Sequence, residues 1–356
     1  MKAVVFAKTD DLQVIEVEKP IPQPDQVLIK VAYCGICATD YDNFRGFTSF
    51  AKNGGLRYPL RFGHEWSGVV CEVGSEVTEL KVGDKVVGDG KVTCNECENC
   101  KSGKWYDCMN IRSVGTVHDH WPGAMAEYLL MPARNVFKIG DHVSLKAAAM
   151  CEPVNIAMNG FRECSIEGKT VLVIGSGPIA MGGIAAAKVL GAKKIICAGR
   201  KPFKLQKARE MGATDIIDLT KGTLYEQIRP LNDGRLVDFA LETTGCTDFV
   251  ENVMNIVASM GTMSMIGFYE RPLNNFDLDQ IIFGKITLRG ASGARQIAPV
   301  VADLISEGKI DLMPLMTHKL DFYKDAERMM DFYASVPAER LKVLVEIGGE
   351  DVGSTI

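Results

Sequence analysis

The sequence lacks any apolar run, free of charge and of glycine, that is long enough to span a bilayer. Its apolar stretch at the start is too short for a signal peptide, and no basic cluster suggests a membrane surface. A net charge of -5 gives no support for nucleic-acid binding. Internal repeats and low-complexity segments are also missing. We therefore expect a cytoplasmic protein with neither nucleic-acid nor membrane partners.

The composition is that of a globular protein. The chain has 356 residues, 47% of them hydrophobic and 24% charged, which predicts two domains with substantial cores. Its 11 cysteines are an odd number, and four of them lie within residues 94–108. In an intracellular chain of this size, such clustering favours metal ligands over disulfides.

Residues 171–200 read as strand, glycine turn, helix and second strand. The turn is Gly175-Ser176-Gly177-Pro178-Ile179-Ala180. Gly175 permits a tight turn, Gly177 lets the backbone approach a pyrophosphate, and Ala180 allows close helix–strand packing. The phosphates would bind at the helix N-terminus, where unpaired N–H groups favour anions. Ordinary βαβ packing can produce such a string alone, but the flanking strands favour a dinucleotide site.

The residues after the second strand, 194–198, bear on the choice of cofactor. An NAD site usually carries Asp or Glu there to bind the ribose 2′-hydroxyl, whereas this chain has Gly199, followed by Arg200 and Lys201. Arg200 can bind a 2′-phosphate bidentately, and Lys201 adds a point charge. NADP(H) is therefore favoured over NAD(H). The alternative is that the two cations are a solvated loop pair.

Strands and helices continue to alternate beyond this unit, which predicts an α/β fold with a parallel, doubly wound sheet. The expected elements are a helix over 203–211 and strands over 215–217, Val237–Glu242 and 261–267. The strand Val237–Glu242 ends at Thr243, which we place among the cofactor-binding residues. A helix near 297–307 and a closing strand over 342–347 are assigned back to the first domain.

The first domain carries a candidate metal set on two segments. A predicted strand delivers Cys37 to a surface, and a long loop leads into His64 and Glu65. Thiolate, imidazole and carboxylate together make a plausible zinc site with room for water or substrate. Taken singly, Cys37 is more typical of a core residue and His64 of a structural one, and Thr39 or Asp40 can merely cap a helix.

Four cysteines form the most specific metal motif in the chain. They are Cys94, Cys97, Cys100 and Cys108. Four thiolates within such a short lobe can close tetrahedrally on Zn²⁺ and leave no place for substrate, which predicts a structural zinc. A reduced cysteine-rich loop is one alternative. A nucleic-acid zinc ribbon is another, but Glu96, Glu98 and Asp107 make the lobe a poor partner for phosphate.

Two weaker candidates complete the set. Glu152 follows a helix-forming patch and is either a metal ligand or a carboxylate facing water, with Cys151 as the competing ligand. His118 and His120 form an H-x-H pair in a loop, where such a pair is more often solvated or substrate-lining than metal-bound. We keep His118 only as a weak pocket candidate.

These motifs together resemble the zinc-containing medium-chain dehydrogenase/reductase superfamily, the alcohol dehydrogenase superfamily, over essentially the whole chain. The pair Glu65 and Glu152 is similar to its sorbitol and threonine dehydrogenase branch. The resemblance implies a GroES-like, mostly β catalytic domain and a Rossmann domain. We expect the first over 1–154 and 291–356, with the structural-zinc lobe at about 91–110, and the second over 155–290.

The resemblance also implies roles for individual residues and two zinc ions per chain. Cys37, His64 and Glu65 would bind a catalytic zinc, with Glu152 as a fourth or exchanging ligand. The four cysteines of the lobe would bind the structural zinc. Thr39 would take the substrate proton. Relatives often have histidine three residues after this Thr, where the present chain has Asp42, so either Asp42 or water would end the proton relay.

The expected reaction is reversible oxidation of a secondary alcohol to a ketone, with hydride transfer to NADP(H) or NAD(H). A second carboxylate near the zinc, and Arg45, Arg57 and His118, favour a polyol, cyclitol or amino-cyclitol. The alternatives are an L-threonine-type amino-alcohol dehydrogenase and a non-catalytic zinc protein that binds NADP(H). By resemblance we expect a homodimer or homotetramer, paired through the strand at 261–267.

Overall fold

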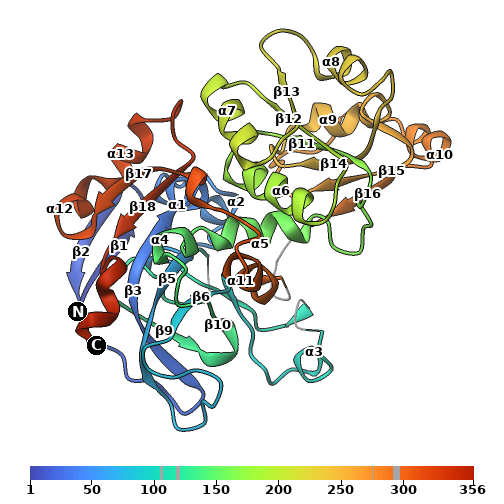
Figure 1. Ribbon diagram of the computed structural model, residues 1–356. Helices are drawn as coiled ribbons and strands as arrows, with labels where there is room; N and C mark the ends of the chain where they lie inside the picture. Colours follow the sequence, from blue (N-terminus) through green and yellow to red (C-terminus); the bar gives the residue numbers. More distant parts are fainter. Residues whose placement is uncertain (105–106, 118–120, 275, 292–296) are drawn as a thin grey trace. The chain divides into compact units, whose positions relative to one another are not determined.

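The computed structural model describes residues 1–104, 107–117, 121–274, 276–291 and 297–356. These form two compact units (Figure 1). Unit 1 contains residues 1–152 and 295–356, and unit 2 contains residues 153–294. Unit 1 is thus built from both ends of the chain, whereas unit 2 is one continuous segment.

Unit 2 is built on a six-stranded sheet in which every pairing is parallel. Its strands are β11 (Thr170–Ile174), β12 (Lys194–Gly199), β13 (Asp215–Asp218), β14 (Val237–Glu242), β15 (Val257–Met265) and β16 (Thr287–Gly290). They lie in the order β13-β12-β11-β14-β15-β16. This order reverses between β11 and β14, which is the point where doubly wound sheets bind their ligands. The parallel sheet predicted from the sequence is confirmed.

Helices cover both faces of this sheet (Figure 1). They are α6 (Pro178–Val189), α7 (Pro202–Met211), α8 (Leu224–Leu231), α9 (Thr247–Glu251) and α10 (Asp279–Gly284). A Cβ at Gly183 of α6 would lie 2.5 Å from Leu241 and 3.7 Å from Val173, so the missing side chain lets α6 lie close to the strands. On the other face, α8 and α9 share a buried cluster with Leu172 and Ile174.

Two predicted features of the sheet are wrong. The strand expected over 261–267 begins four residues earlier, at Val257. Met260 takes a positive φ of 66° and bends β15 in the middle, so the two parts of the strand do not follow one regular pattern. This strand also lies between β14 and β16, with hydrogen bonds on both sides. It is therefore no sheet edge and cannot pair across a twofold axis; the edge strand next to it is β16.

Unit 1 is mostly β. A seven-stranded sheet has the order β10-β6-β5-β3-β18-β17, with β9 also paired to β3. A second sheet has the order β2-β1-β4, and β7 pairs with β8. The bounds are β1 (Lys2–Lys8), β2 (Asp11–Glu16), β3 (Gln26–Ile36), β4 (Leu60–Arg61), β5 (Glu65–Val73), β6 (Lys85–Gly88), β7 (Lys91–Val92), β8 (Arg112–Ser113), β9 (Tyr128–Pro132), β10 (Val136–Lys138), β17 (Met316–Asp321) and β18 (Lys342–Glu346).

The helices of unit 1 are short. They are α1 (Ala38–Phe44), α2 (Ser49–Lys52), α3 (Glu98–Lys101), α4 (Leu145–Ala148), α11 (Ala298–Ser306), α12 (Phe322–Asp325) and α13 (Met329–Ser335), while α5 (Cys151–Asn159) begins in unit 1 and continues in unit 2. The helix-forming patch expected before Glu152 forms α4, and α5 begins at Cys151 just after it. Within the described residues, no helix is long and apolar enough to cross a membrane.

Strand β3 is the centre of unit 1. It spans 11 residues and pairs antiparallel with β5, with β9 and with β18, which comes from the far end of the chain. Beside this sheet, Phe6 and Phe62 stack with ring centroids 4.2 Å apart, and both rings are fully buried. These contacts make the two ends of the chain one core.

We expect Phe6→Ala to lower the free energy of unfolding by about 3–5 kcal/mol, since it leaves a cavity against Phe62. Urea denaturation measures this loss. Phe50→Ala is the matched control, because Phe50 is 46% exposed in the same unit and its loss should change stability by about 0.5 kcal/mol or less. Equal losses in the two variants would contradict this account of the core.

Candidate metal and nucleotide sites

Three of the predicted ligands converge in unit 1. One sulfur, nitrogen or oxygen atom from each of Cys37, His64 and Glu65 lies within 4.8 Å of the other two. Cys37 directly follows β3 and caps α1, while Glu65 begins β5. Since Gly35 of β3 pairs directly with Glu65, the ends of two neighbouring strands bring the set together.

Two glycines make room for this cluster. A Cβ at Gly35 would collide with Oε2 of Glu65, so only glycine lets the carboxylate lie across the strand. Gly63 has a φ of +96°, which favours glycine, and a Cβ there would lie 2.7 Å from Sγ of Cys34. Cys34 itself is fully buried and serves as a small packing residue.

Asp40, in the first turn of α1, supports the cluster. Its Oδ2 accepts a hydrogen bond from the backbone N–H of Cys37 at 2.8 Å, and its Oδ1 lies 3.6 Å from Nδ1 of His64. Burial raises the pKa of Asp40 to about 6. Burial alone would lower the pKa of His64, but Asp40 and Cys37 outweigh it and raise that pKa well above its usual value. A carboxylate behind a histidine fixes the ring's orientation, as at many metal sites.

Lys342 is a residue of this site that the sequence did not predict. Its Nζ lies 2.6 Å from Oε1 and 2.5 Å from Oε2 of Glu65, and both side chains are almost fully buried. Burial would lower the pKa of Lys342, but Glu65 and Cys37 raise it above the ordinary lysine value, so the lysine stays charged. The available signal was a lysine at the start of the apolar strand 342–347, which predicts a buried partner of opposite charge.

Glu152 lies near the cluster without joining it. Burial raises its pKa to about 7; the charge of His64 opposes this rise, and that of Glu65 adds to it. It is not among the residues whose donor atoms all lie within 4.8 Å of one another. Cys151, the competing candidate, is buried, and burial alone raises the pKa of its thiol.

The two relay candidates lie on one helix. Thr39 and Asp42 are three residues apart on α1, so they are neighbours on its surface, and both are partly exposed. Arg45, at the end of the same helix, forms an ion pair with Asp10 at 3.1 Å. His118 and His120 lie outside the described residues.

The second metal group is the four-cysteine lobe. Its sulfur atoms all lie within 4.8 Å of one another, around the short helix α3. The backbone N–H groups of Glu96 and Cys97 lower the pKa of Cys94 to about 6, which favours the thiolate that a metal needs. All 11 cysteines of the chain are free, so no disulfide accounts for the clustering.

In unit 2 the glycine turn has the geometry that the sequence predicts. Gly175 takes a φ of +117°, and a Cβ there would collide with the Thr243 hydroxyl. Gly177 caps α6, Pro178 is the first residue of that helix, and a Cβ at Gly177 would meet no atom within 4 Å. The N-terminus of α6 is therefore open on the side of Gly177, where an anion can approach the backbone.

The loop after β12 shows why residue 199 is glycine. A Cβ at Gly199 would lie 2.7 Å from Oγ of Ser176, so the glycine turn occupies the place of a side chain there. Arg200 and Lys201 follow it and are exposed, and neither forms an ion pair within the described residues. Thr243, across the turn, donates its hydroxyl to the carbonyl of Ile174 at 2.7 Å.

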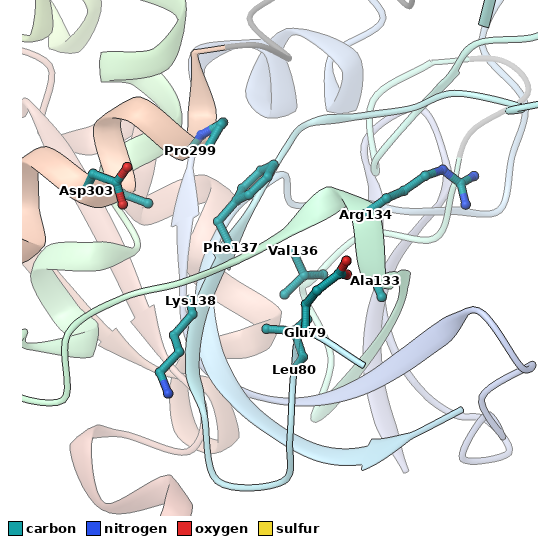
Figure 2. Close-up of a pocket in the computed structure, with 10 residues that line it drawn as sticks. Glu79, Leu80, Ala133, Arg134, Val136, Phe137, Lys138, Pro299 and Asp303 are labelled. Atoms are coloured by element: carbon teal, nitrogen blue, oxygen red, sulfur yellow. The ribbon is translucent and has the colours of Figure 1, made fainter. Parts of the chain in front are cut away.

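Unit 1 also contains a cavity of about 350 Å³ away from these residues (Figure 2). Phe137 and Val136 from β10 line it together with Pro299 and Asp303 from α11. Its two cations are already paired, Arg134 with Asp25 and Lys138 with Asp84. The cavity brings none of the predicted site residues together.

Comparison with known proteins links both units to dehydrogenases. Residues 23–141 match the family model described as "Alcohol dehydrogenase GroES-like domain". Residues 178–307 match the model described as "Zinc-binding dehydrogenase". The four-cysteine lobe and the candidate ligands at 37, 64 and 65 fall within the first match, and α6 begins the second.

Individual relatives span nearly the whole chain. The L-threonine 3-dehydrogenase of Alteromonas mediterranea is 32% identical over 92% of this chain and 96% of its own length. A zinc-binding dehydrogenase of Sinorhizobium meliloti, solved with NADP bound, is 29% identical with a TM-score of 0.86, covering 97% and 98% of the two chains. The galactitol-1-phosphate dehydrogenase of Escherichia coli is 28% identical with a TM-score of 0.85, covering 97% and 100%.

Removing the buried cation should be costly. We expect Lys342→Met to lower the free energy of unfolding of the metal-free protein by about 3–5 kcal/mol, because Glu65 is left as an uncompensated buried charge. Urea denaturation with a chelator present measures this loss.

The matched control is Lys319→Met on the neighbouring strand β17. Lys319 pairs with Glu346, and both side chains are partly exposed, so its loss should cost about 1 kcal/mol or less. Similar costs for the two variants would show that Glu65 does not depend on Lys342.

Proposed function

Since the chain belongs to the zinc-containing medium-chain dehydrogenase/reductase superfamily, we propose that it interconverts a secondary alcohol and a ketone. It is an NAD(P)-dependent alcohol dehydrogenase, and the GroES-like and Rossmann-type fold class predicted from the sequence is confirmed. The observation that carries the proposal is the convergence of Cys37, His64 and Glu65. Residues 1–154 and 291–356 are proposed as the catalytic domain and 155–290 as the cofactor-binding domain.

The cluster fits a catalytic zinc ion. A thiolate, an imidazole and a carboxylate are donors that zinc takes, and three protein ligands leave a position for substrate. Nδ1 of His64 faces Asp40, which leaves Nε2 as the donor atom. When bound, the zinc supplies Lewis acidity to a substrate hydroxyl and the nicotinamide accepts a hydride. Glu152 is proposed as a fourth or exchanging ligand, since it lies close enough to His64 and Glu65 for their charges to shift its pKa.

The chain's own residues then handle the proton. Thr39 takes it from the substrate hydroxyl, as the matching position does in the family. Asp42 lies one turn further along α1 and is partly exposed, so it can pass the proton to water. This route replaces the histidine relay of many relatives.

The four-cysteine lobe fits a second, structural zinc. Its four sulfur atoms lie within 4.8 Å of one another and would fill the tetrahedral set of a zinc ion, which would leave no position for substrate. The lowered pKa values of Cys94 and Cys97 favour thiolates at two of the four positions. Two zinc ions per chain are proposed.

A hydroxyl-rich substrate is the class we propose: a polyol, cyclitol or amino-cyclitol. The galactitol-1-phosphate dehydrogenase among the similar structures supports polyols. Arg45 gives less support than its sequence position suggests, because it already pairs with Asp10 and lies over the Phe47 ring. Arg57 remains exposed.

L-threonine is the second candidate substrate. The L-threonine 3-dehydrogenase that is 32% identical over most of the chain favours it. Asp42 at the relay position and the NADP preference proposed below count against it. The third reading, a zinc protein without catalysis, is set aside because the family is one of dehydrogenases.

Two further expectations stay predictions. We propose a homodimer or homotetramer that forms through the β16 edge of the sheet in unit 2. Near this edge strand, Leu278, Ile282 and Phe283 are exposed apolar residues. The cytoplasmic location inferred from the sequence is the other.

The reaction is tested by recording reduction of NADP⁺ and NAD⁺ by the zinc-loaded protein with polyols, cyclitols, amino-cyclitols, threonine and simple secondary alcohols. We expect turnover with a ring or chain polyol, lost in Cys37→Ala because a zinc ligand is removed. Turnover with threonine alone would transfer the proposal to the second candidate.

Metal analysis supplies the control. Cys37→Ala should lose one zinc and keep the structural one, whereas Cys100→Ser should lose the other, because the two clusters share no residue. A wild-type protein that holds a single zinc, unaffected by Cys37→Ala, would overturn the catalytic-site assignment.

The cofactor preference rests on Arg200 and Lys201. We expect Arg200→Ala to raise KM for NADP⁺ about tenfold, which is the loss of about 1.4 kcal/mol, and to leave KM for NAD⁺ nearly unchanged. Arg235→Ala is the control, since Arg235 is an exposed arginine of the same unit. Equal changes with both cofactors would mean that Arg200 does not contact a 2′-phosphate.

A further inference from the structure

Glu242 is a fully buried carboxylate that no predicted role uses. It is the last residue of β14, at the carboxyl end of the sheet, beside the point where the strand order reverses. No lysine or arginine of the described residues forms an ion pair with it. Burying a charge without a cation is costly unless hydrogen bonds satisfy the charge. The hydrogen-bond partners of Glu242 therefore indicate its role.

Four neutral donors surround this carboxylate. Oε1 accepts the backbone N–H of Thr244 at 2.6 Å and the Thr244 hydroxyl at 2.5 Å. Oε2 accepts the N–H of Gly245 at 3.1 Å and the hydroxyl of Tyr269 at 2.7 Å. Burial and the neighbouring carboxylate raise the pKa of Tyr269, so this hydroxyl keeps its proton. Three bonds hold the loop after β14, and the fourth ties it to the loop after β15.

The two loops and the glycine turn form one layer at this end of the sheet. Thr243 bonds to the carbonyl of Ile174, immediately before the turn. Gly245 has a φ of +70°, and a Cβ there would collide with the carbonyl oxygen of Phe268. A shift of the loop after β14 therefore displaces both of its neighbours.

Arg200 and the N-terminus of α6 set the direction in which the dinucleotide would lie along the carboxyl end of the sheet. The adenosine half is proposed near Arg200, after β12, and the pyrophosphate at the N-terminus of α6, after β11. Because β14 and β15 lie on the far side of β11 from β12, the nicotinamide half extends toward their loops.

We propose that Glu242 is a positioning residue that holds the loops after β14 and β15 in the conformation that receives the nicotinamide half of the cofactor. The carboxylate touches no cofactor atom in this arrangement and acts through Thr244, Gly245 and Tyr269. The inference rests on the proposed placement of the cofactor on unit 2.

The test compares the whole cofactor with its adenosine half. NADPH and 2′,5′-ADP are titrated against the zinc-loaded wild type and Glu242→Gln, whose amide cannot accept all four bonds. We expect Kd for NADPH to rise about tenfold, equivalent to about 1.4 kcal/mol, with Kd for 2′,5′-ADP unchanged. Tyr269→Phe, which removes one of the bonds, should give a smaller rise of the same kind.

Glu226→Gln is the matched control. Glu226 also accepts a threonine hydroxyl and a backbone N–H, but it does so at the start of α8, and it should leave both Kd values unchanged. If Glu242→Gln lowers the melting temperature and leaves both Kd values unchanged, or raises both equally, the positioning role is wrong.

Failure of the cofactor proposal gives a different result. A wild type that binds NADH more tightly than NADPH would refute the NADP preference, and the comparison then uses NADH and ADP. A wild type that binds neither dinucleotide would overturn the placement of the cofactor itself. Both of these results would be seen in the wild type, whereas a failure of the positioning role would be seen only when Glu242→Gln is compared with the wild type.

Discussion

The antiparallel pairing of β3 with β5 on one side and with β18 on the other is the constraint on which the candidate metal site depends. It places Gly35 between Glu65 and the chain that carries Lys342. Because side chains alternate along a strand, a slip of one residue would turn Glu65 to the opposite face. The register of this sheet therefore decides whether a carboxylate reaches Cys37 and His64 at all.

Each unit buries a carboxylate at its candidate site, and the two are neutralised differently. Glu65 faces a lysine ammonium and lies where a metal cation would add further positive charge. Glu242 faces only hydroxyl and N–H groups, so its charge is spread over four hydrogen bonds. The first arrangement suits a group that binds a cation, and the second suits a group that fixes backbone.

Much of the fold was predictable because its signals are local. The glycine turn at 175–180 indicates a strand, a helix and a second strand by spacing alone, and the cysteine spacing at 94–108 indicates four sulfur atoms that converge. The three residues at 37, 64 and 65 were found for a different reason, since their chemistry and the family resemblance single them out. The start of β15 was missed because the bend at Met260 hides the continuity of the strand.

The supporting residues could not be predicted from spacing. Lys342 lies 277 residues from Glu65, and nothing near either residue indicates the other. Asp40 reads as a helix cap, which it is, and its approach to His64 exists only after the loop before β5 has folded. Glu242 looks like the end of an ordinary strand until Tyr269 is placed beside it.

The split of unit 1 between both ends of the chain has a consequence for biosynthesis. Unit 2 is contiguous and can fold as soon as it leaves the ribosome, whereas β3 waits for β18. At translation rates of about 5–20 residues per second, roughly 10–40 s separate Glu152 from Lys342. During that interval the four cysteines of the lobe are already on the growing chain, while Glu65 has no counter-charge. A nascent chain can thus assemble the cysteine lobe before the cluster of Cys37, His64 and Glu65 has its buried cation.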